Sequence, residues 1–223
     1  PAPRVVLLML AHFLTGVVAY PGHCNGQHAN ERAFAVLDSS GTIHLWGEWS
    51  SGGTGAAPTG SGFISIASNS GAFAALDSAG AISAWGSPSS GGGDSGAWAG
   101  TDCSSSDTQC NNAPTGSGFI SIASTGQGFA VLHSSGTISA WGWHSPGGVG
   151  LTGSGFVSIA STTTAFAALD GSGTVSAWGD SSSGGSGAPT GSGFRFSTMG
   201  YTQHNGCSSS MTPKIRLPPR TPP

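Results

Sequence analysis

The sequence predicts an all-β repeat protein built from about four short units of three strands each. Three observations lead to this prediction. The phrase AFAALDSAGAISAWG at 72–86 recurs with small changes at 33–47, 128–142 and 165–179. A second phrase, TGSGF, also occurs four times, and short apolar runs alternate with polar residues between glycine-rich turns. A repeat of this length indicates that each unit buries its apolar face against its neighbours.

Each unit contains three segments in which the side chains alternate. In the second unit, Ile64 and Ile66 alternate with Ser65, and the same period of two follows at 72–77 and 81–86. A period of two is typical of strands, whereas no segment within the repeats has helical spacing. We therefore expect three strands in every unit.

The turn between the second and third segments has a defined chemistry. Asp77 opens it and Gly80 closes it in the second unit, and these are the preferred first and fourth residues of a type I turn. His133 replaces the Asp in the third unit. The residues after each Trp-Gly pair are rich in Gly, Ser and Pro, so we expect surface loops there, with small residues that let neighbouring units approach closely.

The spacing of the Trp-Gly pairs locates an insert. Trp46, Trp85, Trp141 and Trp178 are 39, 56 and 37 residues apart. The long spacing contains an insert at about 94–112, which includes two cysteines and a tryptophan. Loops on a regular scaffold commonly carry specificity, so the insert is a candidate partner-specific element.

Charge is distributed unevenly along the chain. The net charge is −3, and 7% of the residues are charged, against about a quarter in an average soluble domain. Eight of the nine acidic residues and none of the six Lys and Arg residues lie in 33–194. Nucleic-acid binding requires cations that displace phosphate counterions, so we expect no nucleic-acid partner for the repeats.

The repeats resemble those of a known superfamily. An apolar strand, a strand ending in Ala-Leu, a glycine turn and a strand ending in Trp-Gly are similar to the repeats of the regulator-of-chromosome-condensation superfamily, which form β-propeller blades. The unit length is closer to the short three-stranded blades of secreted β-lactamase-inhibitory propellers. The resemblance covers 33–198 and implies a β-propeller-like domain of about four blades.

Two departures limit what the resemblance implies. The superfamily usually has seven blades, and it usually has a His in the second-strand motif, where this chain has Ala33, Ala72, Gly128 and Ala165 beside the Phe. Nucleotide exchange on a small GTPase is therefore not implied, because no position matches a site that would support it.

The ends of the repeat region leave the closure of the fold open. The repeats begin at a second strand, at Ala33, and end after a first strand, GSGFRFS. These partial units could share one blade and close a ring without exposed sheet edges. The alternative is an open arc or a linear β array, whose edges would favour assembly into polymers.

The flanking segments differ from the repeats. Residues 5–20 are mostly apolar and follow Arg4, and they are shorter than the about 20 residues of a membrane span. They fit a secretory signal cleaved before Tyr20, with a retained membrane anchor or a buried segment as alternatives. We expect a secreted protein or one in an organelle lumen, or else a membrane-anchored one. The expected division of the chain is 1–22 signal or anchor, 23–32 linker, 33–198 repeat domain and 199–223 Pro-rich tail.

Four cysteines allow three pairings. Cys103 and Cys110 would close a small loop in the insert, and Cys24 and Cys207 flank the repeats and would join the two ends of a closed ring. Both bonds need an oxidising compartment, and free thiols are the alternative. A metal site is the third possibility, but its residues match no standard zinc spacing: His23, Cys24, His28, His204 and Cys207. We expect neither a metal nor a cofactor.

Catalytic patterns are not evident in the sequence. The serines lie in polar turns, and the histidines within the repeats have no nucleophile or paired carboxylate in register. We therefore expect no enzyme. The candidate interaction residues are the tryptophans that occur once, in loops, and a neighbouring histidine: Trp49, Trp98, Trp143 and His144. The alternative for these tryptophans is that they fold back over their own blade. The repeated tryptophans are expected to serve blade packing: Trp46, Trp85, Trp141 and Trp178.

Three functions are consistent with these patterns. The first is a non-enzymatic interaction or scaffold module, an accessory or structural component of an extracellular or lumenal assembly, with a protein partner or self-association. The second is a polymer-forming surface protein bearing O-linked sugars. The third is a carbohydrate-binding propeller that uses the loop tryptophans. We expect the first, and we expect membrane contact only through residues 5–20 if they are retained.

Overall fold

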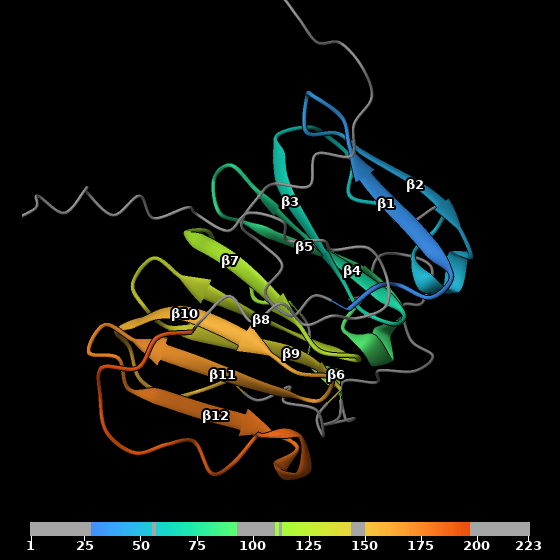
Figure 1. The fold of residues 1–223 in the computed structure, drawn as a ribbon. Helices are drawn as coiled ribbons and strands as arrows, with labels where there is room; N and C mark the ends of the chain where they lie inside the picture. The colour runs from blue at the N-terminus through green and yellow to red at the C-terminus, as the bar shows by residue number, and fades with distance from the viewer. Residues whose placement is uncertain (1–27, 55–56, 93–109, 112, 144–149, 197–223) are drawn as a thin grey trace, which may run out of the picture.

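The computed structural model describes residues 28–54, 57–92, 110–111, 113–143 and 150–196, and these form an all-β structure (Figure 1). The strands are β1 (Ala33–Leu37), β2 (Ile43–Gly47), β3 (Phe63–Ser68), β4 (Ala72–Asp77), β5 (Ile82–Gly86), β6 (Cys110–Asn111), β7 (Phe119–Ser124), β8 (Gly128–His133), β9 (Ile138–Trp143), β10 (Phe156–Ser161), β11 (Ala165–Asp170) and β12 (Val175–Gly179). Short 3-10 helices follow β2, β5 and β12: η1 (Trp49–Ser51), η2 (Pro88–Ser90) and η3 (Ser181–Ser183).

The strands pair into antiparallel sheets, which we call blades 1 to 4. Blade 1 is β1–β2, blade 2 is β3–β4–β5, blade 3 is β7–β8–β9 with β6 added at its edge, and blade 4 is β10–β11–β12. The all-β, propeller-like repeat expected from the sequence is confirmed. Within the described residues, blade 1 has two strands, and the short strand of the insert gives blade 3 a fourth (Figure 1).

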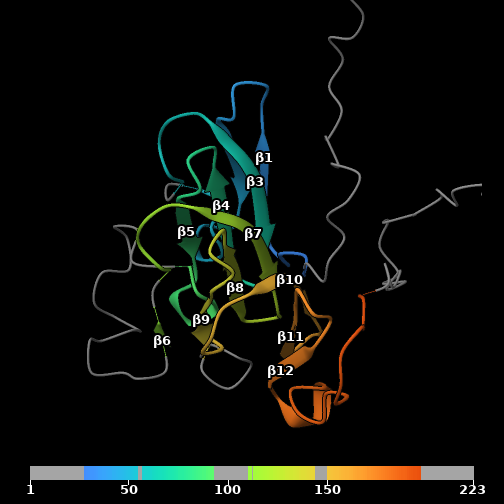
Figure 2. The ribbon, with the colours of Figure 1, turned by 90° about the vertical axis from the view of Figure 1, so that its left-hand side faces the viewer.

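The first strands of successive blades lie along one edge of the molecule. β3, β7 and β10 follow one another there (Figure 2), and β3 and β7, and β7 and β10, are in contact. Each of these strands has a β-bulge after its first residue, as between Phe63 and Ser65 of β3. The bulge places the residue between them, Ile64, outside the regular pairing of the sheet.

The hairpin turns follow the chemistry expected from the sequence. The Gly80 N–H donates to the Asp77 carbonyl at 3.0 Å, which is the bond of a type I turn. The Asp77 carboxylate accepts two further backbone N–H groups of the same turn. In blade 3, the Nδ1 atom of His133 accepts from the Ser135 N–H at 3.0 Å, so the histidine replaces the aspartate as an acceptor.

Each blade has one aromatic face and one face of smaller side chains. In blade 2, Phe73 and Trp85 stack at 5.3 Å between ring centroids and pack with Ala33 and Ile43 of blade 1. The aromatic rings are large and the opposing side chains are small, so the two faces complement each other in size.

The other face of blade 2 repeats this arrangement toward blade 3. Ala74 and Leu76 pack with Phe129 and Trp141, and all four side chains are almost fully buried. The junction of blades 3 and 4 uses the same pattern, with Phe166 and Trp178 against small residues of blade 3. The core is therefore a series of blade-to-blade junctions, each with the same polarity.

Two series of backbone hydrogen bonds also join the blades. At the hairpin turns, the Phe119 N–H of blade 3 donates to the Gly80 carbonyl of blade 2 at 3.0 Å, and the other junctions repeat this bond. At the turns between first and second strands, the Ser70 N–H donates to the Gly126 carbonyl at 3.2 Å, and the Gly126 N–H donates to the Thr163 carbonyl at 2.7 Å. The blades are thus fixed at both ends of their strands.

Glycine is required where the hairpin turns touch the next blade. Gly80 has a φ of +80°, and a Cβ atom there would lie 2.6 Å from the Gly118 nitrogen. An L side chain would be strained by the backbone conformation and would also collide with backbone of the next blade.

Candidate interaction surfaces

The turns that follow the first two Trp-Gly pairs are part of the core, which corrects the expectation that these loops lie on the surface. The turn after the fourth pair is exposed, as expected. Gly52, after η1, and Gly91, after η2, are buried and have left-handed conformations, with φ of +87° and +83°. Their carbonyls accept hydrogen bonds from the Nε1 atoms of Trp85 and Trp141, at 3.1 Å and 2.9 Å. The Phe–Trp pair of the next blade therefore packs against each of these turns. We call η1 with Gly52, and η2 with Gly91, receptor turns.

A side chain at these glycines would displace the aromatic pair. A Cβ atom at Gly52 would lie 3.0 Å from both the Phe73 and the Trp85 rings, and one at Gly91 would lie 3.1 Å from both the Phe129 and the Trp141 rings. The small residues predicted to allow close approach do so at this contact.

Polar side chains hold the receptor turns in place. Asn69 is fully buried, and its Oδ1 atom accepts from the Gly71 and Ala72 N–H groups. Its Nδ2 atom donates to the Ser90 carbonyl at 2.7 Å, which ties the turn before β4 to η2. Asn30 makes the corresponding bond to Ser51 in blade 1. Sequence reasoning missed these residues, although an Asn or Thr recurs at this place before every second strand.

The aromatic pair of blade 1 lies at a surface. Phe34 and Trp46 stack at 5.1 Å, as the interior pairs do, but they are 61% and 47% exposed. The repeat predicts blade packing for Trp46. Trp46 does stack on Phe34 of its own blade, but within the described residues no preceding blade covers the pair.

A row of exposed aliphatic side chains follows the first strands. Ile64, Ile120 and Val157 occupy the bulge position of β3, β7 and β10, and they are 49%, 56% and 57% exposed. The alternation in the sequence places Ile64 on the same face as Ile66, but the bulge turns Ile64 outward. The sequence signal for this row was the recurrence of a β-branched residue after the Phe of TGSGF.

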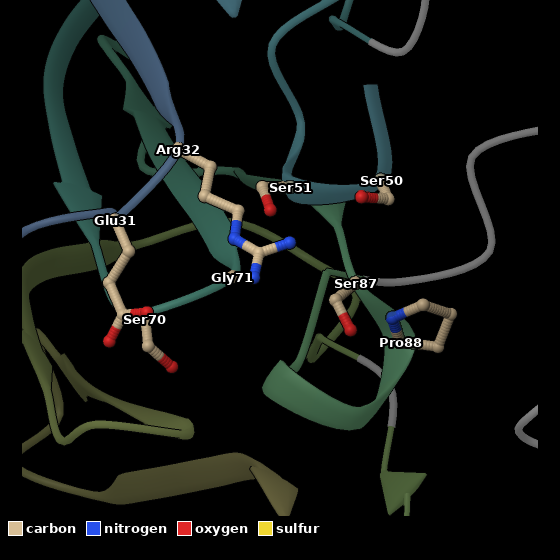
Figure 3. A pocket seen from close by; sticks show the side chains of 8 residues that line it. All are labelled: Glu31, Arg32, Ser50, Ser51, Ser70, Gly71, Ser87 and Pro88. Carbon is tan, nitrogen blue, oxygen red and sulfur yellow. The ribbon is translucent and has the colours of Figure 1, made fainter. Parts of the chain in front are cut away.

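A shallow polar groove of about 300 Å³ lies between blades 1 and 2 (Figure 3). Its lining residues are Glu31, Arg32, Ser50, Ser51, Ser70, Gly71, Ser87 and Pro88. The Arg32 guanidinium extends over the groove and pairs with the Glu48 carboxylate at 3.2 Å. Hydrogen bonds from Ser50, and then from Arg32, hold the pKa of Glu48 below its ordinary value. The groove therefore presents hydroxyl groups and a cation that is already paired.

The strongest electrostatic perturbation lies at the first hairpin turn. The Nε2 atom of His44 lies 2.9 Å from the Asp38 carboxylate, which also accepts from Ser40 and from the Thr42 N–H. These bonds, that of His44 first, hold the pKa of Asp38 far below its usual range. The pair is exposed, and the neighbouring Ser40 hydroxyl bonds to the Asp38 carboxylate and to the Thr42 hydroxyl, so the chemistry of this group is that of a stabilised turn.

The interaction residues expected from the sequence are only partly covered by the described chain. Trp49 begins η1 and is 52% exposed. Trp98 and His144 lie outside the described residues, as does the side chain of Trp143, whose backbone pairs with Cys110 at the edge of blade 3. Of this set, only the side chain of Trp49 lies within the described residues, so the role of all four stays a prediction.

The cysteine side chains of the two expected disulfides also lie outside the described residues. Cys24, Cys103 and Cys207 are not described, and of Cys110 only the backbone is. Among the described residues, no group of three or more His, Cys, Asp and Glu side chains is placed to hold a metal ion. Within this same part of the chain, no helix is both long and apolar enough to span a membrane.

Comparison with known proteins gives structural likeness only. No family profile matches the sequence, and no curated protein matches it. Solved structures with a similar arrangement include Prp20p from Saccharomyces cerevisiae (14% identity, TM-score 0.47, 68% of this chain and 44% of that one) and human WBSCR16 (19%, 0.45, 68% and 46%). The ectodomain of the receptor kinase CR4 from Physcomitrella patens is a third (13%, 0.48, 70% and 40%).

This chain spans about half the length of those proteins or less. Their activities and partners are not carried over to it at this level of similarity.

Proposed function

We propose that this chain is a non-enzymatic protein-interaction module, a scaffold component of an extracellular or lumenal assembly, with repeats of the regulator-of-chromosome-condensation type. The observation that carries the proposal is the row of exposed aliphatic residues on the first strands. Ile64, Ile120 and Val157 recur in the same register on successive blades. Repeat proteins bind partners through such regularly spaced surface positions.

The physical character of the row favours a protein partner. Its side chains are apolar and branched, and their exposure leaves apolar area that a partner could cover, which is favourable by about 25 cal/mol per Å². Residues 33–194 contain no Lys or Arg, and their acidic residues include Asp77 and Asp170, which pair with the residues before Ile64 and Val157. An apolar row with a polar rim has the composition of a protein interface.

Charge substitutions in the row test this proposal. We would immobilise the full chain and the triple variant Ile64→Glu, Ile120→Glu, Val157→Glu, and capture proteins from the secreted and membrane fractions of the source organism. The control carries three added carboxylates at exposed sites away from the row: Thr54→Glu, Gln127→Glu and Ser186→Glu. We expect the same specific partner with the wild type and the control, and its loss with the row variant. A partner retained equally by all three folded proteins would contradict the assignment of the row.

The proposed location has its own test, the intact mass of the natively isolated chain before and after reduction. Removal of about the first 20 residues as a signal, with a gain of about four mass units on reduction from two disulfides, is expected. A chain that keeps residues 5–20 and has free thiols would instead be membrane-anchored and would contradict both bonds.

A further inference from the structure

The two ends of the blade series have complementary faces. At the first end, blade 1 exposes the aromatic face that interior blades bury: Phe34 and Trp46 are 61% and 47% exposed, whereas Phe73 and Trp85 are 3% and 0% exposed. Both pairs have the same stacked geometry, with ring centroids 5.1 Å and 5.3 Å apart. Blade 1 therefore exposes an aromatic pair that already has the geometry of a buried one. We call Phe34 and Trp46 the aromatic knob.

The last end presents the matching receptor. Gly184 follows η3 in a left-handed conformation, with φ +94°, as Gly52 and Gly91 follow η1 and η2. A Cβ atom at Gly52 or Gly91 would touch the aromatic rings of the next blade, whereas one at Gly184 would meet nothing within 4 Å. The receptor turn is built in blade 4, and within the described residues nothing fills it.

The sheet beside this turn is also less buried than the same face of the interior blades. Ala74 of blade 2 and Ala130 of blade 3 are fully buried under the aromatic face of the next blade. The corresponding residue of blade 4, Ala167, is partly exposed, and so is Leu169, which corresponds to the buried Leu76.

The series of backbone hydrogen bonds at the turns before the second strands also stops at blade 4. The N–H groups of Glu31, Ser70 and Gly126 each donate to a carbonyl of the next blade. The N–H of Thr163, the next donor, has no acceptor among the described residues. The acceptor that continues the series would belong to a further blade that follows blade 4.

We propose that a second copy of this chain supplies that further blade: the Phe34–Trp46 face of one copy docks on the Gly184 face of the next. The contact continues, with the same residue types and polarity, the blade-to-blade interface found inside the chain. The Trp46 Nε1 atom donates to the Gly184 carbonyl, as Trp85 donates to Gly52. The Thr163 N–H donates to the Glu31 carbonyl of the neighbour.

A second copy is favoured over the chain's own opposite end. Among the residues that the structure describes, nothing covers either face, and blades 1 and 4 lie at opposite ends of the series (Figure 1). A contact between two different faces is heterologous, so it forms a ring if its rotation closes and a filament if it does not. It uses neither Ile64 nor the rest of the row, so this proposal and the proposed function can fail separately.

The test is a mixing experiment with one variant of each face. Phe34→Glu places a carboxylate on the aromatic face, and Ala167→Arg places a long cation on the receptor face. Gln127→Glu and Gln127→Arg are the matched controls, since Gln127 is exposed on an interior blade. Sedimentation velocity of the full chain is measured from low to high concentration, and circular dichroism establishes that each variant is folded.

We expect the wild type and both controls to gain mass with concentration, and each face variant alone to stay monomeric over a range at least tenfold higher. An equimolar mixture of the two face variants should give a dimer and nothing larger, because one intact knob and one intact receptor remain. Should Ala167→Arg fail to fold, Gly184→Lys replaces it, since a Cβ atom there meets nothing within 4 Å. Its φ of +94° adds backbone strain, so circular dichroism must establish that this variant is folded as well.

Three results would overturn the proposal. The first is a monomeric wild type at all concentrations. The second is continued association of Ala167→Arg alone, which indicates two aromatic faces back to back. The third is a mixture of the two variants that stays monomeric.

Discussion

The Phe73–Trp85 pair of blade 2 and the Phe34–Trp46 pair of blade 1 have the same sequence motif and nearly the same stacking, but opposite surroundings. Trp85 is fully buried and donates to Gly52, whereas Trp46 is 47% exposed. The difference lies in what precedes the blade and not in the blade itself. Burial in this fold is thus set by position in the series, because each blade contributes half of every junction.

Replacing each of the two tryptophans with alanine should give the largest difference in the free energy of unfolding between blades 1 and 2. Trp85→Ala deletes a buried ring and its hydrogen bond, so the free energy of unfolding should fall by about 3 to 5 kcal/mol. Trp46→Ala, at concentrations where the chain is monomeric, removes one exposed stacking partner and should cost about 1 kcal/mol. Urea denaturation of both variants measures the difference. Equal losses would contradict the contrast between the two blades.

Crowding at the hairpin turns gives the next largest effect. Gly80→Ala should lower the free energy of unfolding by about 3 kcal/mol, since it combines a left-handed backbone with a collision against the next blade. Gly187 is the matched control, because its φ of +75° is close to that of Gly80 but a Cβ atom there meets nothing within 4 Å. Gly187→Ala should cost only the conformational part, about 1 kcal/mol. If the two variants lose the same stability, the turns do not join the blades.

Much of the fold could be predicted from the sequence because the repeat encodes it locally. The alternation gave the strands, and Asp77 with Gly80 gave the hairpin, since both depend on neighbours along the chain. The receptor role of Gly52 could not be predicted, because it depends on a ring in the next blade. The outward position of Ile64 was missed for a similar reason, as the bulge that turns it is set by pairing with β4.

The candidate surfaces were predicted less well than the fold. Trp46 carries the same motif as Trp85, and no pattern within the motif distinguishes the first blade from the interior ones. Only exposure in the folded chain separates such residues, as it does Trp46 and Trp85.

A smaller effect is expected for the asparagines that hold the receptor turns. Asn69→Ala leaves buried N–H groups and the Ser90 carbonyl without their partner, which should cost about 2 kcal/mol in the free energy of unfolding. Asn30→Ala removes the same bonds in blade 1, where the side chain is only partly buried, and should cost about 1 kcal/mol. Thermal and urea unfolding of the two variants would check the order, and a larger loss for Asn30→Ala would reverse it.

The smallest effect concerns the exposed Asp38–His44 pair, which only blade 1 has. The pKa of Asp38 lies far below its usual range, chiefly because of the His44 hydrogen bond, so His44→Ala should raise it. Because the folded-state pKa is lowered, the carboxylate stabilises the fold above about pH 4, and this contribution disappears as the pH falls through the folded-state pKa. Carboxyl NMR titration measures the shift. Asp170 is the control, since Ser172 and Thr174 lower its pKa without a histidine, and its titration should not change.

The contrast between the two aromatic pairs is tested most directly by the solvent exposure of the two indoles. The full chain would be labelled with 5-fluorotryptophan, and Trp46→Phe and Trp85→Phe would assign the two resonances. At low concentration, we expect a clear shift between H2O and D2O for Trp46 and none for Trp85, and the shift of Trp46 should disappear as copies associate. A Trp46 resonance that is shielded from solvent at the lowest concentration, or a Trp85 resonance as exposed as that of Trp46, would contradict this account.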